Sequence, residues 1–150
     1  MNPEDTPDTG VTWHFGDPFG EQRAAERGAA VIDRSHRRVI TLTGPERLSW
    51  LHSITSQHLT HLPDRTATQN LNLDGSGRVL DHFHLIDVDG TTYLDTEPAA
   101  LAPKEAPLSP DLATYLQRMV FRSDVQVQAR DDLAVLTVIG PEAETVAARV

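Results

Sequence analysis

The stretch over residues 68–87, TQNLNLDGSGRVLDHFHLID, constrains the fold more than any other part of the sequence. Residues typical of β-strands flank the run Asp74-Gly75-Ser76-Gly77, whose glycines can adopt the positive φ values that a hairpin turn requires. A second tight turn, Asp89-Gly90, leads into the β-type run over residues 91–95. The sequence therefore predicts three antiparallel strands that follow one another along the chain.

A carboxylate stands on an apolar face of the second of these strands. Side chains alternate between the two faces of a strand, so Val79, Asp81, Phe83 and Leu85 share one face. A carboxylate among apolar neighbours must be paired, or its pKa rises. A solvated Asp81 is an equally open interpretation, because charged residues this close to a turn are often exposed.

Short polar side chains follow the first strand. The opposite face carries three side chains with hydrogen-bonding groups, which are Thr68, Asn70 and Asn72. They could form hydrogen bonds with the edge of a flat, polar heterocycle. A solvent-facing strip is the more ordinary interpretation, since antiparallel sheets often have one wet face.

Two helices are predicted from their start signals and apolar spacing. Thr43-Gly44-Pro45-Glu46 reads as a capping box with a proline in the first turn, which predicts a helix over residues 45–57 with Trp50 in the core. The second helix begins near residue 112 and carries an apolar stripe with the spacing i, i+3, i+4, i+7, i+8. That stripe consists of Leu112, Tyr115, Leu116, Met119 and Val120.

The remaining strands complete an α+β fold, with a largely antiparallel sheet and helices packed on it. Residues 30–33 and 38–42 are expected to be the first strands of this sheet, and residues 124–130 alternate as a one-sided strand. Residues 133–139 are apolar throughout, which predicts a central strand covered on both faces. The sequence ends within the helix that Pro141 begins, so we expect residues 13–150 to be an incomplete domain.

Composition narrows the possible partners. With 13 Lys and Arg against 22 Asp and Glu, the net charge of −9 repels polyanions, which disfavours direct binding to nucleic acid or to an anionic membrane surface. The chain has no cysteine, and its acidic N-terminus is unlike a signal peptide, so we expect a cytoplasmic protein. Residues 1–12 have the composition of a disordered acidic tail.

Two histidine groups could suggest a metal site. His52 lies in the predicted helix over residues 45–57 and His58 and His61 follow it, whereas His82 and His84 share one strand face. No carboxylate or cysteine ligand set converges with them in the sequence, so solvated histidines are the preferred interpretation and no metal ligand is assigned.

Four stretches together resemble a known family. They are the strand-to-helix stretch over residues 39–51, the Leu-x-x-x-Gly-x-x-x-Asp run of residues 73–81, the helix and strand over residues 112–127, and Ile32-Asp33-x-Ser35-His36. In these stretches the sequence resembles the N-terminal part of the YgfZ/GcvT family, folate-binding proteins related to the aminomethyltransferase (T-protein) of the glycine cleavage system. The resemblance implies that residues 13–150 are an incomplete folate-binding domain.

The resemblance also implies a ligand and its site. Tetrahydrofolate would lie over the central sheet, where Asp81 accepts hydrogen bonds from the aminopyrimidine edge of the pterin and Gly77 lets the ring approach the backbone. The cofactor-binding residues implied are Asn70, Asn72, Gly77, Asp81 and His82.

One departure from the family bears on activity. Aminomethyltransferases have two adjacent aspartates where this sequence has Asp81-His82, which favours the YgfZ-like branch. That branch is implicated in maintaining iron–sulfur enzymes and in a linked tRNA modification, so its implied partners are iron–sulfur proteins or their assembly factors. The chain lacks the cysteine of the YgfZ signature motif. The alternatives are an aminomethyltransferase with Asp81 as the catalytic, charge-stabilising carboxylate, and a scaffold without a ligand.

Overall fold

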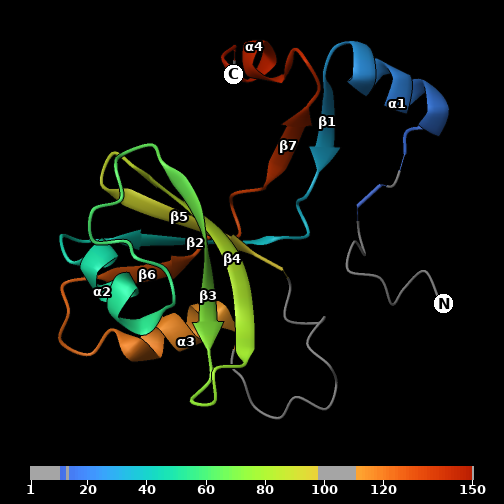
Figure 1. Cartoon of the computed structure of the whole chain (residues 1–150). Coiled ribbons are helices and arrows are strands. Elements are labelled where there is room, and N and C mark those ends of the chain that lie inside the picture. Colours follow the sequence, from blue (N-terminus) through green and yellow to red (C-terminus); the bar gives the residue numbers. More distant parts are fainter. Residues whose placement is uncertain (1–10, 13, 98–110, 150) are drawn as a thin grey trace. The chain divides into compact units, whose positions relative to one another are not determined.

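The computed structural model describes residues 11–12, 14–97 and 111–149, which fall into two compact units (Figure 1). One unit comprises residues 37–133, and the other comprises the chain up to residue 36 and from residue 134 onward. Of the predicted disordered tail, only residues 11 and 12 lie within the described part of the chain.

The larger unit is built on a five-stranded antiparallel sheet, which confirms the predicted α+β fold. The strand order is β3-β4-β5-β2-β6, and each pair of neighbours is antiparallel. The strands are β2 (Arg38–Thr43), β3 (Ala67–Leu73), β4 (Val79–Val88), β5 (Thr91–Thr96) and β6 (Gln126–Ala129). The predicted hairpin is therefore β3 and β4, and the predicted third strand is β5.

Two helices cover one face of this sheet. They are α2 (Arg47–Ile54) and α3 (Leu112–Met119), the latter capped at its N-terminus by Asp111. Their buried side chains pack with every second residue of the central strands, so the opposite strand face lies outside this core. The buried apolar core is Ile40, Leu42, Trp50, Leu51, Leu59, Phe83, Leu85, Leu94, Leu112, Leu116 and Val125.

Trp50 lies in the core, as its helical spacing predicts. Its side chain is 6 % exposed, and the indole Nε1–H donates to the carbonyl of Met119 at 3.0 Å. This bond joins α2 to the end of α3, so the indole needs no ligand to account for its burial.

The start of α2 differs from the sequence prediction. The helix begins at Arg47 rather than Pro45, and within the described part of the chain no side chain caps it. Glu46, expected to complete a capping box, accepts instead from the backbone N–H of Asp124 at 2.5 Å. Gly44 has a φ of +107°, and a Cβ there would stand 2.2 Å from the carbonyl oxygen of Asp124. A contact with a distant segment thus replaces the local capping motif.

The smaller unit contains a two-stranded sheet that the sequence did not predict. Strand β1 (Ala30–Asp33) pairs antiparallel with β7 (Leu136–Ile139), so β1 and β2 do not belong to one sheet as expected. A strand forms in the region 133–139 as predicted, but it is the shorter β7, which has one neighbouring strand within the described residues and in which Leu136 is 60 % exposed. Its coverage on both faces stays a prediction. Helices α1 (Pro18–Arg27) and α4 (Ala143–Ala147) complete the unit. Within the described ranges, no helix is both long and apolar enough to cross a membrane.

Candidate functional site

The polar strip of β3 faces the helix-covered side of the sheet. Asn72 lies opposite Asp81 and Asn70 lies opposite Phe83 in the β3–β4 register, so these side chains share the face of the core. Asn70 is 2 % exposed and Asn72 is 0 % exposed. The expectation of a solvent-facing strip on the opposite face is therefore wrong.

Asn70 is fully engaged within the protein. Its Oδ1 accepts from the backbone N–H groups of Gln57 and Leu71 at 2.9 and 2.8 Å, and its Nδ2 donates to Thr55 Oγ1 at 2.7 Å. These bonds fix the chain that follows α2 against β3. Asn70 thus has a structural role that occupies both ends of its amide.

Asn72 has one bonded end and one unbonded end. Its Nδ2 donates to Asp81 Oδ2 at 2.9 Å, whereas its Oδ1 is buried without a hydrogen-bond partner in the described part of the chain. An unsatisfied buried acceptor costs about 1–3 kcal/mol, so each one calls for an explanation. A ligand that supplies an N–H group would satisfy it.

Asp81 is half-buried, and its surroundings oppose its charge. Burial raises the pKa of Asp81 above its usual value, and the nearby Asp111 charge raises it further against the hydrogen bond from Asn72. Asp111 Oδ1 itself accepts from the N–H of Thr114 at 2.9 Å as the cap of α3. The side chains of Asn72 and Asp81 therefore offer oxygen acceptors to a ligand, near a second carboxylate.

Gly77 lies in the loop between β3 and β4 rather than beside this pair. Its φ is +79°, and its N–H donates to the carbonyl of Asp74 at 2.9 Å. A Cβ at Gly77 would meet nothing within 4 Å, so the turn conformation accounts for the glycine. A part in ligand binding stays a prediction.

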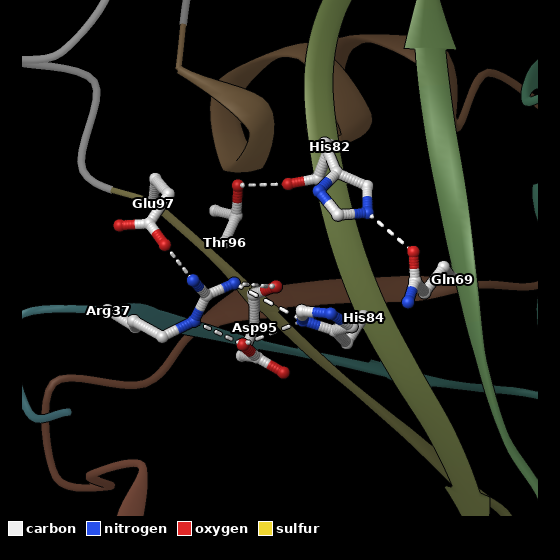
Figure 2. A network of polar contacts seen from close by, with 7 residues as sticks. All are labelled: Arg37, Gln69, His82, His84, Asp95, Thr96 and Glu97. Carbon is white, nitrogen blue, oxygen red and sulfur yellow. Dashed lines mark hydrogen bonds and ion pairs between the residues drawn. The ribbon is translucent and has the colours of Figure 1, made fainter.

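His82 points to the other face of the sheet. It follows Asp81 directly, so its side chain lies on the opposite side of β4, where Nε2 lies 3.0 Å from Gln69 Oε1 (Figure 2). His82 and His84 share this face with ring centroids 5.2 Å apart. The structure therefore separates His82 from Asn72 and Asp81, and its predicted part in cofactor binding is untested.

A charged network occupies the same outer face. Arg37, 8 % exposed, donates to the carboxylates of Asp95 and Glu97. His84 Nδ1 lies 3.4 Å from both Arg37 Nη2 and Asp95 Oδ2, as the close-up in Figure 2 shows. Among the described residues, no group of three or more His, Cys, Asp or Glu has the geometry to hold a metal ion.

Fold and geometry together define an antiparallel α+β domain in which the buried Asn72 and the half-buried Asp81 lie side by side on the helix-covered face of the sheet. The family model described as the GCVT N-terminal domain matches residues 15–150. The chain belongs to this family.

Relatives with curated names are aminomethyltransferases. The chain is 31 % identical over 132 residues to an aminomethyltransferase of Pseudomonas syringae pv. tomato, covering 87 % of this chain and 34 % of that protein. An aminomethyltransferase of Nitrosococcus oceani is 28 % identical over 131 residues, covering 87 % of this chain and 33 % of that protein. The chain thus spans about a third of the length of these relatives.

A solved structure has the same fold. The crystal structure of glycine cleavage system aminomethyltransferase T from Bartonella henselae superposes with a TM-score of 0.69 at 21 % identity, covering 87 % of this chain and 34 % of that one. The GcvT-like part of the sequence resemblance is therefore confirmed. The YgfZ branch, its iron–sulfur partners and the tRNA modification stay predictions.

Proposed function

We propose that this chain supplies the tetrahydrofolate-binding part of an aminomethyltransferase. The observation that carries the proposal is the buried Asn72 Oδ1, which has no hydrogen-bond partner among the described residues, beside the half-buried carboxylate of Asp81. An aminopyrimidine ring presents N–H donors along one edge. That edge complements a pair of side chains that offers oxygen acceptors, and the amide and the carboxylate would each receive one donor.

The names of the relatives support a transferase over a protein that only binds folate. The sequence argument against transfer was the histidine at position 82, where aminomethyltransferases have a second aspartate. Because side chain 82 lies on the opposite face of β4 from Asp81, an acid there would not join the Asn72–Asp81 pair. The substitution therefore leaves the proposed site unchanged.

In the proposed reaction, the carboxylate of Asp81 stabilises the positive charge that develops on the folate. In such a transfer a folate nitrogen would form a bond to the donor's carbon while the bond from that carbon to its carrier breaks, so positive charge would build on the nitrogen until it loses its proton. That nitrogen lies across the pterin from the aminopyrimidine edge, so Asp81 would act on its charge through the ring rather than by direct contact. A carboxylate held partly away from water stabilises such a charge more strongly than one in bulk solvent. Asn72 orients this carboxylate through its 2.9 Å hydrogen bond and holds the pterin with its other end.

The test is a calorimetric titration of tetrahydrofolate into the chain under anaerobic conditions. Asp81→Asn preserves volume and removes the charge, so we expect roughly a ten- to hundred-fold loss of affinity, the value of one charge-assisted hydrogen bond. His82→Gln, the adjacent residue on the other face, is the matched control and should bind as the wild type does.

Two results would overturn the proposal. The first is an absence of binding heat with the wild type, which is what a ligand-free scaffold predicts. The second is equal affinity in Asp81→Asn. Recovery of the folate by mass spectrometry after incubation with an aminomethyl donor separates transfer from storage, since a storage protein returns tetrahydrofolate unchanged.

A further inference from the structure

A β-bulge interrupts strand β4 beside the candidate site. In the β3–β4 register, Asn72 lies opposite Asp81. The next residue of β3, Leu73, lies opposite Val79, so the register skips one residue of β4. That extra residue is Leu80, which has no cross-strand partner on β3. In such a bulge, two residues of one strand stand opposite a single residue of the other.

The bulge changes which side chains lie on the face of Asn72 and Asp81. Cross-strand partners share a face, so Val79 lies with Leu73 on the face opposite to Asn72. The alternation that puts Val79 beside Asp81 in the sequence therefore fails at this point. Leu80 alternates with Val79 instead, so its side chain lies on the face of Asn72 and Asp81.

Leu80 is an exposed apolar side chain beside these two polar ones. It is 43 % exposed, and it is not part of the buried apolar core. Asn72, across the strand pair, is 0 % exposed, and its Oδ1 has no hydrogen-bond partner among the described residues. Bulges are frequent next to functional sites, where they redirect a side chain. Core packing within the described ranges does not account for a leucine at this position.

We propose that Leu80 is a further ligand-binding residue, whose side chain packs against the face of the pterin ring that Asn72 and Asp81 hold by its edge. This inference rests on the proposed function. Binding sites are lined mostly by apolar side chains, and a few polar groups fix the orientation of the ligand. Hydrogen bonds to the edge of the ring orient it but leave its apolar face in water. Contact with Leu80 removes part of that face from water and favours a flat ring over a smaller ligand with the same donors.

The test is a calorimetric titration of tetrahydrofolate into the whole chain under anaerobic conditions. Leu80→Ala should weaken binding by about three- to ten-fold, because the exposed part of the leucine is no longer there to be buried against the ring. Leu80→Met keeps the volume and the apolar character, so it should bind within about two-fold of the wild type. Leu80→Thr retains the preference for a strand and should lose affinity as the alanine variant does, which covers the case in which alanine weakens the hairpin.

The matched control is Leu73→Ala. Leu73 is 38 % exposed in the same hairpin but lies on the opposite face, so its truncation should change the affinity by less than about two-fold. A second ligand, methyltetrahydropterin, has the same ring without the aminobenzoyl-glutamate tail. Leu80→Ala should weaken the binding of both ligands by the same factor, because the contact is with the ring.

Three results would overturn the inference while leaving the proposed function intact. They are equal affinity of Leu80→Ala and the wild type, an equal loss in Leu73→Ala, and a loss that occurs with tetrahydrofolate but not with methyltetrahydropterin. The second result would show an effect of the hairpin as a whole, and the third would assign Leu80 to the tail of the ligand. The proposed function is tested separately by Asp81→Asn, and if the wild type binds neither ligand, both the function and this inference fail.

Discussion

The ion pair of Arg47 and Asp87 gives the sharpest prediction about stability. Arg47 Nε and Nη2 donate to the two oxygens of Asp87 at 2.9 and 2.8 Å, and Thr92 Oγ1 donates to the same carboxylate at 2.6 Å. Asp87 is 4 % exposed, and the Arg47 side chain is 16 % exposed. This bidentate pair holds the first turn of α2 against β4 and β5.

Asp87→Asn keeps the volume but leaves the guanidinium without a counter-charge. Two unit charges about 4 Å apart interact by about 4 kcal/mol at an effective dielectric constant of about 20. Measured losses for breaking buried pairs are about 3–5 kcal/mol, and the partial exposure of Arg47 puts the expected loss near 3 kcal/mol. The control is Asp89→Asn, which breaks an exposed pair with Arg65 and should cost at most about 1 kcal/mol.

The assay is urea unfolding followed by the fluorescence of Trp50, in a Trp13→Phe background because the sequence has two tryptophans. Burial by itself would raise the pKa of Asp87, but the bonds from Arg47 and Thr92 and the Arg47 charge outweigh it and lower the pKa. Its contribution is therefore present above the usual value of 3.8 and is lost as the pH falls through the lower, folded value. If Asp87→Asn lost no more stability than Asp89→Asn, the reasoning would be refuted.

Three further predictions concern the backbone, the site and the smaller sheet. Gly44→Ala should lose about 2–3 kcal/mol in urea unfolding, since its Cβ would meet the Asp124 carbonyl, whereas Gly75→Ala should be neutral; equal effects would contradict this. The raised pKa of Asp81 means that its charge opposes folding, so Asp81→Asn should melt no lower than the wild type at pH 7. The wild type should gain stability relative to Asp81→Asn as the pH falls towards 3.8. If the mutant were less stable than the wild type at pH 7, the predicted direction of the charge effect would be wrong. Leu136→Thr should change stability by at most about 0.5 kcal/mol but reduce binding of a hydrophobic dye, because Leu136 is 60 % exposed; unchanged dye binding would contradict it.

Local signals in the sequence were sufficient for the hairpin and the helical stripe. Alternation places Phe83 and Leu85 on the core face of β4, and both are buried. The stripe beginning at Leu112 runs along α3, whose Leu112 and Leu116 are buried. In each case the pattern extends over several residues of one element, so no distant contact was needed to interpret it.

Contacts between distant segments account for the errors. Strand β1 pairs with β7 more than a hundred residues later, and a run of apolar residues does not reveal its partner. The capping motif at Thr43 was overridden because Glu46 bonds to Asp124, 78 residues away. From the sequence, Asn70 and Asn72 are interpreted as facing solvent. Periodicity cannot show that the chain after α2 supplies hydrogen-bond partners for Asn70.

The site itself was partly accessible from the sequence. The even spacing of Asn70 and Asn72 predicts a shared face, but the pairing of Asn72 with Asp81 depends on a register that shifts at Leu73. Odd and even numbering alone puts His82 on the other face from Asp81, which could have removed it from the site. Asp111 was missed, although an aspartate directly before an apolar stripe is a usual helix N-cap.

The central claim is that Asp81 receives the exocyclic amino group of a pterin and Asn72 receives the neighbouring ring N–H, and a ligand lacking that amino group tests it most directly. The measurement is a double-mutant cycle by calorimetry that compares tetrahydrofolate with an analogue lacking the exocyclic amino group, on the wild type and on Asp81→Asn. We expect the wild type to prefer tetrahydrofolate by about ten-fold or more and Asp81→Asn to lose most of that preference, because the analogue removes the donor of one hydrogen bond and the mutation removes the charge of its acceptor. An identical preference in both proteins would contradict the claim, since the amino group would then be bound by some group other than Asp81.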